Sequence, residues 1–358
     1  MTASSASVAV DVADIADVAR LHAPGDVRLT RVAFQTAGPG EVLVRVTAVG
    51  LCGSDRHWYR EGAIGDTGLA RPLVLGHEFG GVILDGPRAG QRVVADPADP
   101  CGRCEPCRSG RPNICVATRF AGFGTTDGAL RSVMPWPGHL LHRVPDSLGD
   151  DEAALLEPLG VALHTLDLAP VGVGGRAGVF GCGPLGLLLI QLLRLAGASA
   201  IVATDRLAHR VAAARALGAT HGFVVGPGTD DLAVGGVRDE PVDVAFEVAG
   251  DDDAIADAVA AVRPGGRVVL VGIPDGDRSA FPAGMARRKE LSLQLSRRMV
   301  ASDLDRAIAL AEAGAVDLTA LITHRYPLDQ VADAFAMLDS RDGLKVVVNP
   351  TLEGSTES

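Results

Sequence analysis

The chain has 358 residues, 47% of them hydrophobic and 22% charged, which indicates a globular protein of two domains rather than a disordered or fibrous one. Its formal net charge is −11 and its basic runs around Arg287 and Arg297 are short, which argues against a nucleic-acid-binding protein. The N-terminus lacks the basic start and apolar core of a secretory signal peptide. The most apolar stretch, 179–193, is shorter than the about twenty residues of a membrane span. We therefore expect a cytoplasmic protein without membrane contact.

Residues 1–17 are expected to form a frayed N-terminal extension, and residues 18–160 a mostly β domain with irregular loops. The run "EVLVRVTAVG" (41–50) alternates and is rich in Val, as a strand is. The runs "LVLGHEFGGVILDG" and "GQRVVAD" have the same character. Gly and Pro are frequent between these runs, which predicts turns and loops there.

The sequence pattern changes over residues 161–298, where short apolar runs alternate with stretches of helical length. This pattern is typical of a parallel sheet whose strands are joined by right-handed helical crossovers. Strands buried on both faces should be continuously apolar, and these runs are. The expected strands are 176–181, 199–205, 241–250, 267–273 and 291–296, and the expected helices are 184–197, 206–219 and 252–266, the last ending at Pro-Gly-Gly.

Residues 299–358 contain one long helical pattern, 302–315, and end near "GLKVVVNP" (343–350), which indicates an edge strand stopped by proline. We expect this segment to pack back onto the first domain. The chain would then consist of one domain made of 18–160 and 299–358, and a second domain made of 161–298.

The pattern Gly181-x-Gly183-x-x-Gly186 lies between an expected strand and an expected helix. Alone the pattern is weak in a chain with 44 glycines, but this context makes it specific. The first glycine permits a tight turn, the second lets the backbone approach a pyrophosphate, and the third lets the helix pack on the strand. The helix N-terminus then faces the phosphates, so we predict a dinucleotide site.

Asp205 ends the next strand, nineteen residues after Gly186, where a carboxylate accepts the ribose hydroxyls of NAD and repels the extra phosphate of NADP. The alternative for Asp205 is a helix cap, and Arg206 would suit the phosphate of NADP. We favour NAD. The expected cofactor-binding residues are Gly181, Gly183, Pro184, Leu185, Gly186, Asp205, Arg206, Arg210, Val248, Val271 and Gly272.

Four of the six cysteines have the spacing C-x2-C-x2-C-x7-C. They are Cys101, Cys104, Cys107 and Cys115. Such short spacings let one loop wrap a tetrahedral metal ion, and zinc is the ion we favour. Disulfides rarely persist in the cytoplasm, while an iron–sulfur cluster or a redox pair would use similar ligands.

Six motifs, in this order, resemble the zinc-dependent medium-chain dehydrogenases of the alcohol dehydrogenase superfamily. They are "GLCGSDRH", "GHEFGG", "CGRCEPCRSGRPNIC", "LLEPLG", "VFGCGPLG" and "GLKVVV", and they cover nearly the whole chain from about residue 18. The resemblance is greatest to the sorbitol, polyol and threonine dehydrogenase branch. It implies an α/β fold with a GroES-like, mostly β catalytic domain and a Rossmann doubly wound parallel sheet that binds NAD. It also implies a structural zinc on the four cysteines, and a homodimer or homotetramer with 267–273 and 291–296 near its main interface.

In that family the cysteine of "GLCGSD" and the histidine of "GHE" bind a catalytic zinc, which carries over to Cys52 and His77. The polyol and threonine branches complete the site with acids at positions that match Glu78 and Glu157, and the sequence leaves open which of them binds directly. Catalytic zinc usually keeps three protein ligands and one open position. There it would lower the pKa of a substrate alcohol, which would then give hydride to the nicotinamide.

The resemblance also implies a proton path beside the zinc. Ser54 matches the residue that takes the hydroxyl proton, and His57 matches the relay toward solvent. Asp55 matches an acid that orients the zinc histidine. With Glu157, these residues form the expected catalytic set.

A polyhydroxylated substrate, oxidised at a secondary alcohol to a ketone, is expected. Glu157 stands where simple-alcohol enzymes often place a third thiolate, and "GAIGD" (62–66) resembles a loop of sorbitol dehydrogenases. "SRRM" resembles the segment with a substrate-binding arginine, which maps to Arg298, although that residue could instead pair with a carboxylate or a cofactor phosphate. Trp58 is an expected substrate contact. Trp58 and Met299 stand where that branch has tyrosines, so two hydroxyl partners for the substrate are missing. A sugar or a cyclitol therefore fits as well as sorbitol. L-threonine and other secondary alcohols are the alternative.

Three other classes of protein remain as alternatives. The four cysteines by themselves would suit a zinc-finger-like binding protein, but the acidic net charge and the glycine loop count against it. A zinc-free quinone or enone reductase of the same superfamily would lack Cys52 and the "GHE" motif. A non-catalytic scaffold would not need the intact ligand and relay positions.

Overall fold

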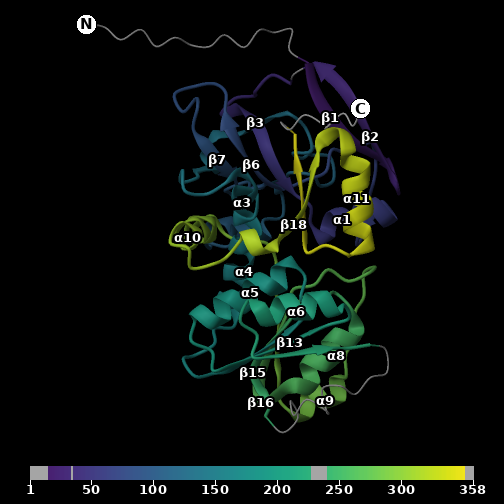
Figure 1. The fold of residues 1–358 in the computed structure, drawn as a ribbon, viewed down its shortest axis with the longest axis vertical. Coiled ribbons are helices and arrows are strands. Elements are labelled where there is room, and N and C mark those ends of the chain that lie inside the picture. The colour runs from purple at the N-terminus through teal and green to yellow at the C-terminus, as the bar shows by residue number, and fades with distance from the viewer. Residues whose placement is uncertain (1–14, 34, 227–239, 351–358) are drawn as a thin grey trace, which may run out of the picture.

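A computed structural model of the chain describes residues 15–33, 35–226 and 240–350 (Figure 1). The expected extension 1–17 lies outside these residues except at its end, which is not frayed, because strand β1 (Ile15–Ala23) begins there. β1 pairs antiparallel with β2 (Asp26–Ala33). The amides of Ala19 and Leu21 donate to the carbonyls of Leu130 and Leu73, which fixes β1 to the rest of the domain.

The domain that the resemblance predicts to be catalytic, and which is called the catalytic domain for that reason, is built on a seven-stranded sheet. Its strand order is β11-β7-β6-β3-β19-β18, with β10 on β3. Its strands are β3 (Glu41–Gly50), β6 (Glu78–Ile83), β7 (Arg92–Ala95), β10 (Val133–Pro137), β11 (Leu141–Arg143), β18 (Ile322–Pro327) and β19 (Lys345–Asn349). The sheet thus takes strands from both ends of the chain. β19 was expected at an edge, but it lies between β3 and β18 and all its residues are buried, which explains its unbroken apolar run.

Helices and short elements complete this domain. They are α1 (Gly53–Glu61), β4 (Ala63–Ile64), β5 (Thr67–Gly68), β8 (Ala98–Asp99), α2 (Glu105–Arg108), β9 (Arg119–Phe120), α3 (Asp150–Ala154), α4 (Leu156–Leu168), α10 (Ala301–Glu312) and α11 (Val331–Ser340). The expectation of strands and loops over 18–160 missed α1 and α4. α1 buries only Asp55 and Trp58, and α4 is buried on most of its surface, so neither sequence shows a clear apolar stripe.

The second domain is a six-stranded parallel sheet in the order β14-β13-β12-β15-β16-β17, and the predicted fold class is confirmed. Its elements are β12 (Arg176–Phe180), α5 (Pro184–Leu195), β13 (Ala200–Asp205), α6 (Ala208–Ala216), β14 (His221–Val224), β15 (Val242–Glu247), α8 (Asp252–Ala261), β16 (Val262–Leu270), α9 (Ala283–Arg288) and β17 (Ser292–Leu295). The helix expected over 252–266 ends early. Val262 already pairs with Val242, and Pro264 favours an extended Arg263 before it.

The two domains share a core at their junction. In Figure 1, α4 and α5 lie between the upper, catalytic sheet and the lower, parallel sheet. One buried apolar cluster continues from α4 through α5 and α10 into the strands of the parallel sheet. β12 and β15 are neighbours at the place where the strand order across the parallel sheet changes direction. Sheets of this kind bind ligands at the carboxyl ends of the strands at such a place. Within the described ranges, none of the helices is long and apolar enough to cross a membrane.

Candidate active site

Cys52, His77 and Glu78 meet in the catalytic domain, with one ligand atom of each within 4.8 Å of the others. Cys52 caps the start of α1, and Glu78 begins β6 directly after His77. Gly50 lies opposite Glu78 in β3, and a Cβ there would come within 2.2 Å of Glu78 Oε2. The absence of a side chain at Gly50 therefore makes room for the carboxylate.

Glu157, in the first turn of α4, lies in the same buried region. Burial raises the pKa of Glu157 to about 8, His77 opposes the rise, and Glu78 and Cys52 add to it. Burial likewise raises the pKa of the Cys52 thiol to about 12. Glu157 is not within the 4.8 Å cluster of the other three residues. A half-buried thiol, a buried imidazole and two buried carboxyls lie in this region, and this donor set fits Zn²⁺.

Asp55 fixes both loops that carry these ligands. Its carboxylate accepts the amides of Cys52 (2.9 Å) and Gly76 (3.2 Å). The same group lies 3.8 Å from His77 Nδ1, so Nε2 is the nitrogen that remains for a metal. Burial raises the pKa of Asp55, although His77 opposes this.

Lys345 is a site residue that the sequence reasoning missed. It is 2% exposed, pairs with Glu78 at 2.5 Å and donates to the carbonyl of Leu51 at 3.0 Å. Burial lowers the pKa of Lys345, but the Glu78 carboxylate outweighs that effect and the pKa is raised. The available signal was a lysine inside an apolar strand, because lysine is seldom buried without a partner.

The helix α1 carries the expected relay residues Ser54 and His57. His57 Nδ1 lies 3.3 Å from Glu61 Oε1 and 3.7 Å from Asp275 Oδ1, and Asp275 belongs to the other domain. Trp58, which the sequence predicts as a substrate contact, points into the domain core. It is 1% exposed and packs edge to face on Phe123 at 5.8 Å, so its indole is part of the core.

Arg298 lies close to the Cys52–His77–Glu78 cluster by way of Phe120. Its guanidinium lies 4.6 Å from the centre of the Phe120 ring, which is 5.4 Å from the His77 ring. Among the described residues Arg298 Nη1 is buried and has no hydrogen-bond partner. Burial lowers the pKa of Arg298 to about 10, and Arg297 adds to this. Its φ is +55°, a backbone conformation that costs a residue with a side chain about 1 kcal/mol.

The four clustered cysteines form a second candidate metal centre, with ligand atoms within 4.8 Å of one another. Sulfur–sulfur distances of 3.4, 3.7 and 3.5 Å join Cys104 to Cys107, Cys104 to Cys115 and Cys115 to Cys101. Tetrahedral zinc thiolates would place sulfurs about 3.8 Å apart, and all four thiols are free, so the set fits zinc. Burial raises the pKa of Cys115, but the Cys101 amide, the Thr118 hydroxyl and the Ala117 amide together outweigh it and lower the pKa to about 6.

The glycine loop follows β12, and Pro184 and Leu185 begin α5 directly after it. Gly181 has φ +110°, which favours glycine. A Cβ on Gly186 would lie 2.0 Å from the carbonyl oxygen of Gly181, whereas one on Gly183 would find only Arg210 Nη1, at 3.7 Å. The space beside Gly183 is therefore open for a ligand to approach the backbone.

Asp205 ends β13 and accepts the amides of Cys182 (2.8 Å) and Leu207 (2.9 Å), which orients its carboxylate at the glycine loop. Arg206 instead contacts Asp251 and Asp253, each at 3.3 Å. The guanidinium of Arg206 is thus already paired with two carboxylates.

The remaining predicted cofactor residues lie around the same edge of the sheet. Arg210 donates to the carbonyls of Arg341 (3.4 Å) and Gly343 (3.2 Å) of the catalytic domain, so it bridges the two domains beside the glycine loop. Val248, Val271 and Gly272 follow the carboxyl ends of β15 and β16.

Comparisons with known proteins agree with this arrangement. The family profile described as "Alcohol dehydrogenase GroES-like domain" matches residues 38–146, and "Zinc-binding dehydrogenase" matches residues 184–313. The chain is 33% identical over 342 residues to a sorbitol dehydrogenase of Bacillus subtilis, covering 92% of this chain and 96% of that one.

Two solved structures resemble the whole fold. The L-idonate 5-dehydrogenase of Escherichia coli superposes with a TM-score of 0.86 at 27% identity, over 94% of this chain and 98% of that one. A zinc-binding dehydrogenase of Sinorhizobium meliloti, bound to NADP, gives a TM-score of 0.85 at 30% identity, over 94% of this chain and 100% of that one.

Proposed function

This chain belongs to the zinc-binding medium-chain dehydrogenases, in the branch of the polyol dehydrogenases, and we propose that it oxidises a secondary alcohol of a polyol, sugar or cyclitol to a ketone, with NAD as hydride acceptor. The observation that carries the proposal is Arg298, whose buried Nη1 has no hydrogen-bond partner among the described residues. Its guanidinium lies over Phe120, the ring that packs on His77 of the Cys52–His77–Glu78 cluster. A substrate with several hydroxyls supplies the acceptors that such a donor lacks.

Cys52, His77 and Glu78 are proposed to hold the catalytic zinc, with Glu157 facing them from α4. When bound, zinc supplies a Lewis acid that lowers the pKa of an alcohol oxygen. Asp55 keeps His77 in the orientation that presents Nε2, and Lys345 offsets the charge of Glu78. The four cysteines are proposed to hold a structural zinc.

Ser54 and His57 are proposed to carry the substrate proton outward along α1. Ser54 Oγ takes the hydroxyl proton, and His57 passes it to solvent, where the Glu61 carboxylate lies 3.3 Å from its ring. His57→Ala should lower kcat near neutral pH by about 10²-fold while zinc content stays unchanged. Loss of zinc in this variant would instead make His57 a ligand.

NAD is proposed over NADP, because Asp205 faces the glycine loop and Arg206 is paired with Asp251 and Asp253. Asp205→Ala should raise the Kd for NAD about tenfold, and Arg206→Ala should leave it nearly unchanged. Tighter binding of NADP than NAD by the unmodified protein, measured by calorimetry, would overturn this cofactor assignment.

The substrate class is tested with a panel of polyols, sugars, cyclitols, amino alcohols and simple alcohols, each with NAD, followed by the absorbance of the reduced cofactor. We expect turnover with polyhydroxylated compounds, and Arg298→Ala should raise their KM about 10- to 100-fold with little change in the Kd for NAD. Turnover confined to threonine or to simple alcohols would overturn the polyol assignment.

A homodimer or homotetramer is proposed as the assembly. β17 is the last strand of the parallel sheet, and Leu295 on it is 71% exposed, which supports pairing of this edge with a second copy. Light scattering should give at least a dimer at micromolar concentration, and a monomer would contradict the proposal.

A further inference from the structure

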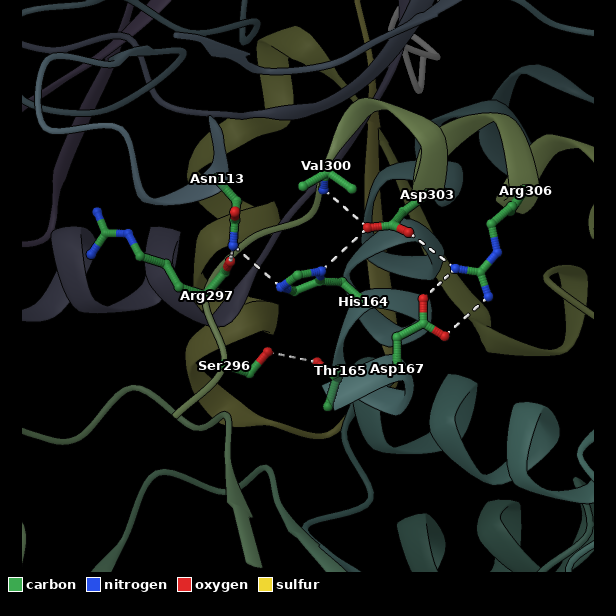
Figure 2. Close-up of polar contacts among 9 residues, drawn as sticks. All are labelled: Asn113, His164, Thr165, Asp167, Ser296, Arg297, Val300, Asp303 and Arg306. Carbon is green, nitrogen blue, oxygen red and sulfur yellow. Dashed lines mark hydrogen bonds and ion pairs between the residues drawn. The ribbon is translucent and has the colours of Figure 1, made fainter. Parts of the chain in front are cut away.

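A polar network, buried at Asn113 and Asp303, starts from the loop of the four clustered cysteines, residues 101–115 (the four-cysteine lobe). It connects this lobe to the segment that carries Arg298 (Figure 2). This segment, 296–300, joins β17 of the parallel sheet to α10 of the catalytic domain. Figure 2 shows it held at three points by side chains from other elements. Thr165 Oγ1 lies 2.9 Å from Ser296 Oγ, and the amide of Val300 donates to Asp303 Oδ2 at 3.0 Å.

The third contact comes from the lobe itself. Asn113, two residues before Cys115, donates from Nδ2 to the carbonyl of Arg297 at 3.0 Å. The same amide nitrogen lies 3.2 Å from His164 Nε2. A carbonyl only accepts, so the amide nitrogen, not its oxygen, faces Arg297, and both Nδ2 hydrogens are used.

His164 extends the network to α10. Because Asn113 donates to its Nε2, the ring proton resides on Nδ1, which faces Asp303 Oδ2 at 3.4 Å. Asp303 is 2% exposed and also contacts Arg306, which pairs with Asp167 on α4. Asn113 of the lobe, Thr165 of α4 and Asp303 of α10 therefore fix the crossing segment directly. The Arg306–Asp167 pair touches Asp303 but not the segment itself.

The strand that directly follows the lobe contacts the side chain of Arg298. Phe120, in the short strand β9 that follows the lobe, lies under the guanidinium at 4.6 Å. Asn113 thus fixes the backbone one residue before Arg298, and Phe120 fixes its guanidinium. The left-handed backbone of Arg298, at φ +55°, needs such support because it is unfavourable by itself.

We propose that the four-cysteine lobe is a positioning element for substrate recognition, and that Asn113 is the residue through which it holds Arg298 in place. The inference rests on the proposed role of Arg298 as a substrate contact. Within the described part of the chain, the hydrogen bonds of Asn113 go to His164 and Arg297 and not to the Cys52 cluster or the glycine loop, so its effect should be confined to substrate binding.

The test is Asn113→Ala in the metal-loaded protein, with Asn113→Asp as a second variant that keeps the shape but loses the donor hydrogens. We expect KM for the best polyol of the panel to rise roughly 3- to 10-fold, the effect of one hydrogen bond, with kcat, zinc content and the Kd for NAD nearly unchanged. Asp167→Ala, which cuts the exposed far end of the network, is the matched control and should leave KM unchanged.

A double-mutant cycle decides whether Asn113 acts through Arg298. In an Arg298→Ala background, Asn113→Ala should raise KM no further, whereas an equal rise there would overturn the proposal. In the substrate-free protein, the backbone amides of 296–300 should exchange hydrogen faster in Asn113→Ala but not in Asp167→Ala. Unchanged exchange in Asn113→Ala would count against the proposal. If Arg298→Ala itself leaves KM unchanged, the proposed substrate contact fails instead, which separates the two conclusions.

Discussion

The packing of the glycine loop on α5 makes Gly186→Ala a stringent test of the cofactor site. A Cβ at this position would lie 2.0 Å from the carbonyl oxygen of Gly181, whereas real Cβ contacts stay above 3.0 Å. The loop and helix would have to separate by about 1 Å within a close-packed core, which costs about 1–3 kcal/mol. We expect Tm to fall by roughly 2–10 °C. The affinity for NAD should fall as well, because the helix N-terminus moves away from the pyrophosphate position.

Gly183→Ala is the matched control for this effect. Gly183 has φ −70°, which alanine adopts, and an added Cβ would find only Arg210 Nη1 within 4 Å. Stability should change by less than about 1 kcal/mol, while the Kd for NAD should rise about tenfold or more, because the methyl group occupies the approach to the backbone. Thermal scans at one fixed rate and calorimetric titration with NAD measure the two quantities. Equal Tm losses in both variants, or an unchanged Kd in Gly183→Ala, would refute the reasoning.

Three further predictions concern buried ionisable groups and the metal sites. Burial raises the pKa of Glu247 to about 7, so the native state retains a proton that the unfolded chain has lost above pH ~4.3. The contribution of Glu247 to the free energy of unfolding should therefore fall by about 3 kcal/mol as pH rises from ~4.5 to 7. In urea unfolding, Glu247→Gln should differ from the unmodified protein by this pH-dependent amount, and equal pH slopes would contradict it. In the metal-free protein, Lys345→Met should lower the free energy of unfolding in urea by about 3–5 kcal/mol, because it leaves Glu78 buried and unpaired. Lys345→Arg, which keeps the charge, should lose less, and equal losses in the two variants would show that packing is decisive. Elemental analysis should show that Cys101→Ser loses one of about two zinc ions per chain, whereas the control Cys182→Ser keeps both. An unchanged metal content in Cys101→Ser would exclude a zinc site on the lobe.

The sequence alone was sufficient where a site is built within a short stretch of chain. The glycine loop and the four-cysteine lobe each need particular residue types at fixed short spacings, so their geometry is encoded locally. The alternation of apolar runs and helical stretches predicted the parallel sheet, because that arrangement imposes its own period on the chain. Errors occurred at boundaries, as at Pro264, and in helices such as α1 and α4 that present no apolar stripe.

Tertiary structure decided what lies between distant segments. Lys345 and Glu78 are 267 positions apart and meet because β19 pairs with β3, a neighbour that no local pattern specifies. Asn113 and Arg297 are 184 positions apart, and their contact depends on how the lobe lies against the junction of the two domains. The orientation of Trp58 into the core was likewise fixed by the packing of α1, since a helix in sequence does not show which of its faces is covered. Residue types and spacings thus determined the chemistry available to this protein. Long-range strand pairing and domain packing determined which side chains lie together, because these contacts depend on the whole buried core and not on any short stretch of sequence.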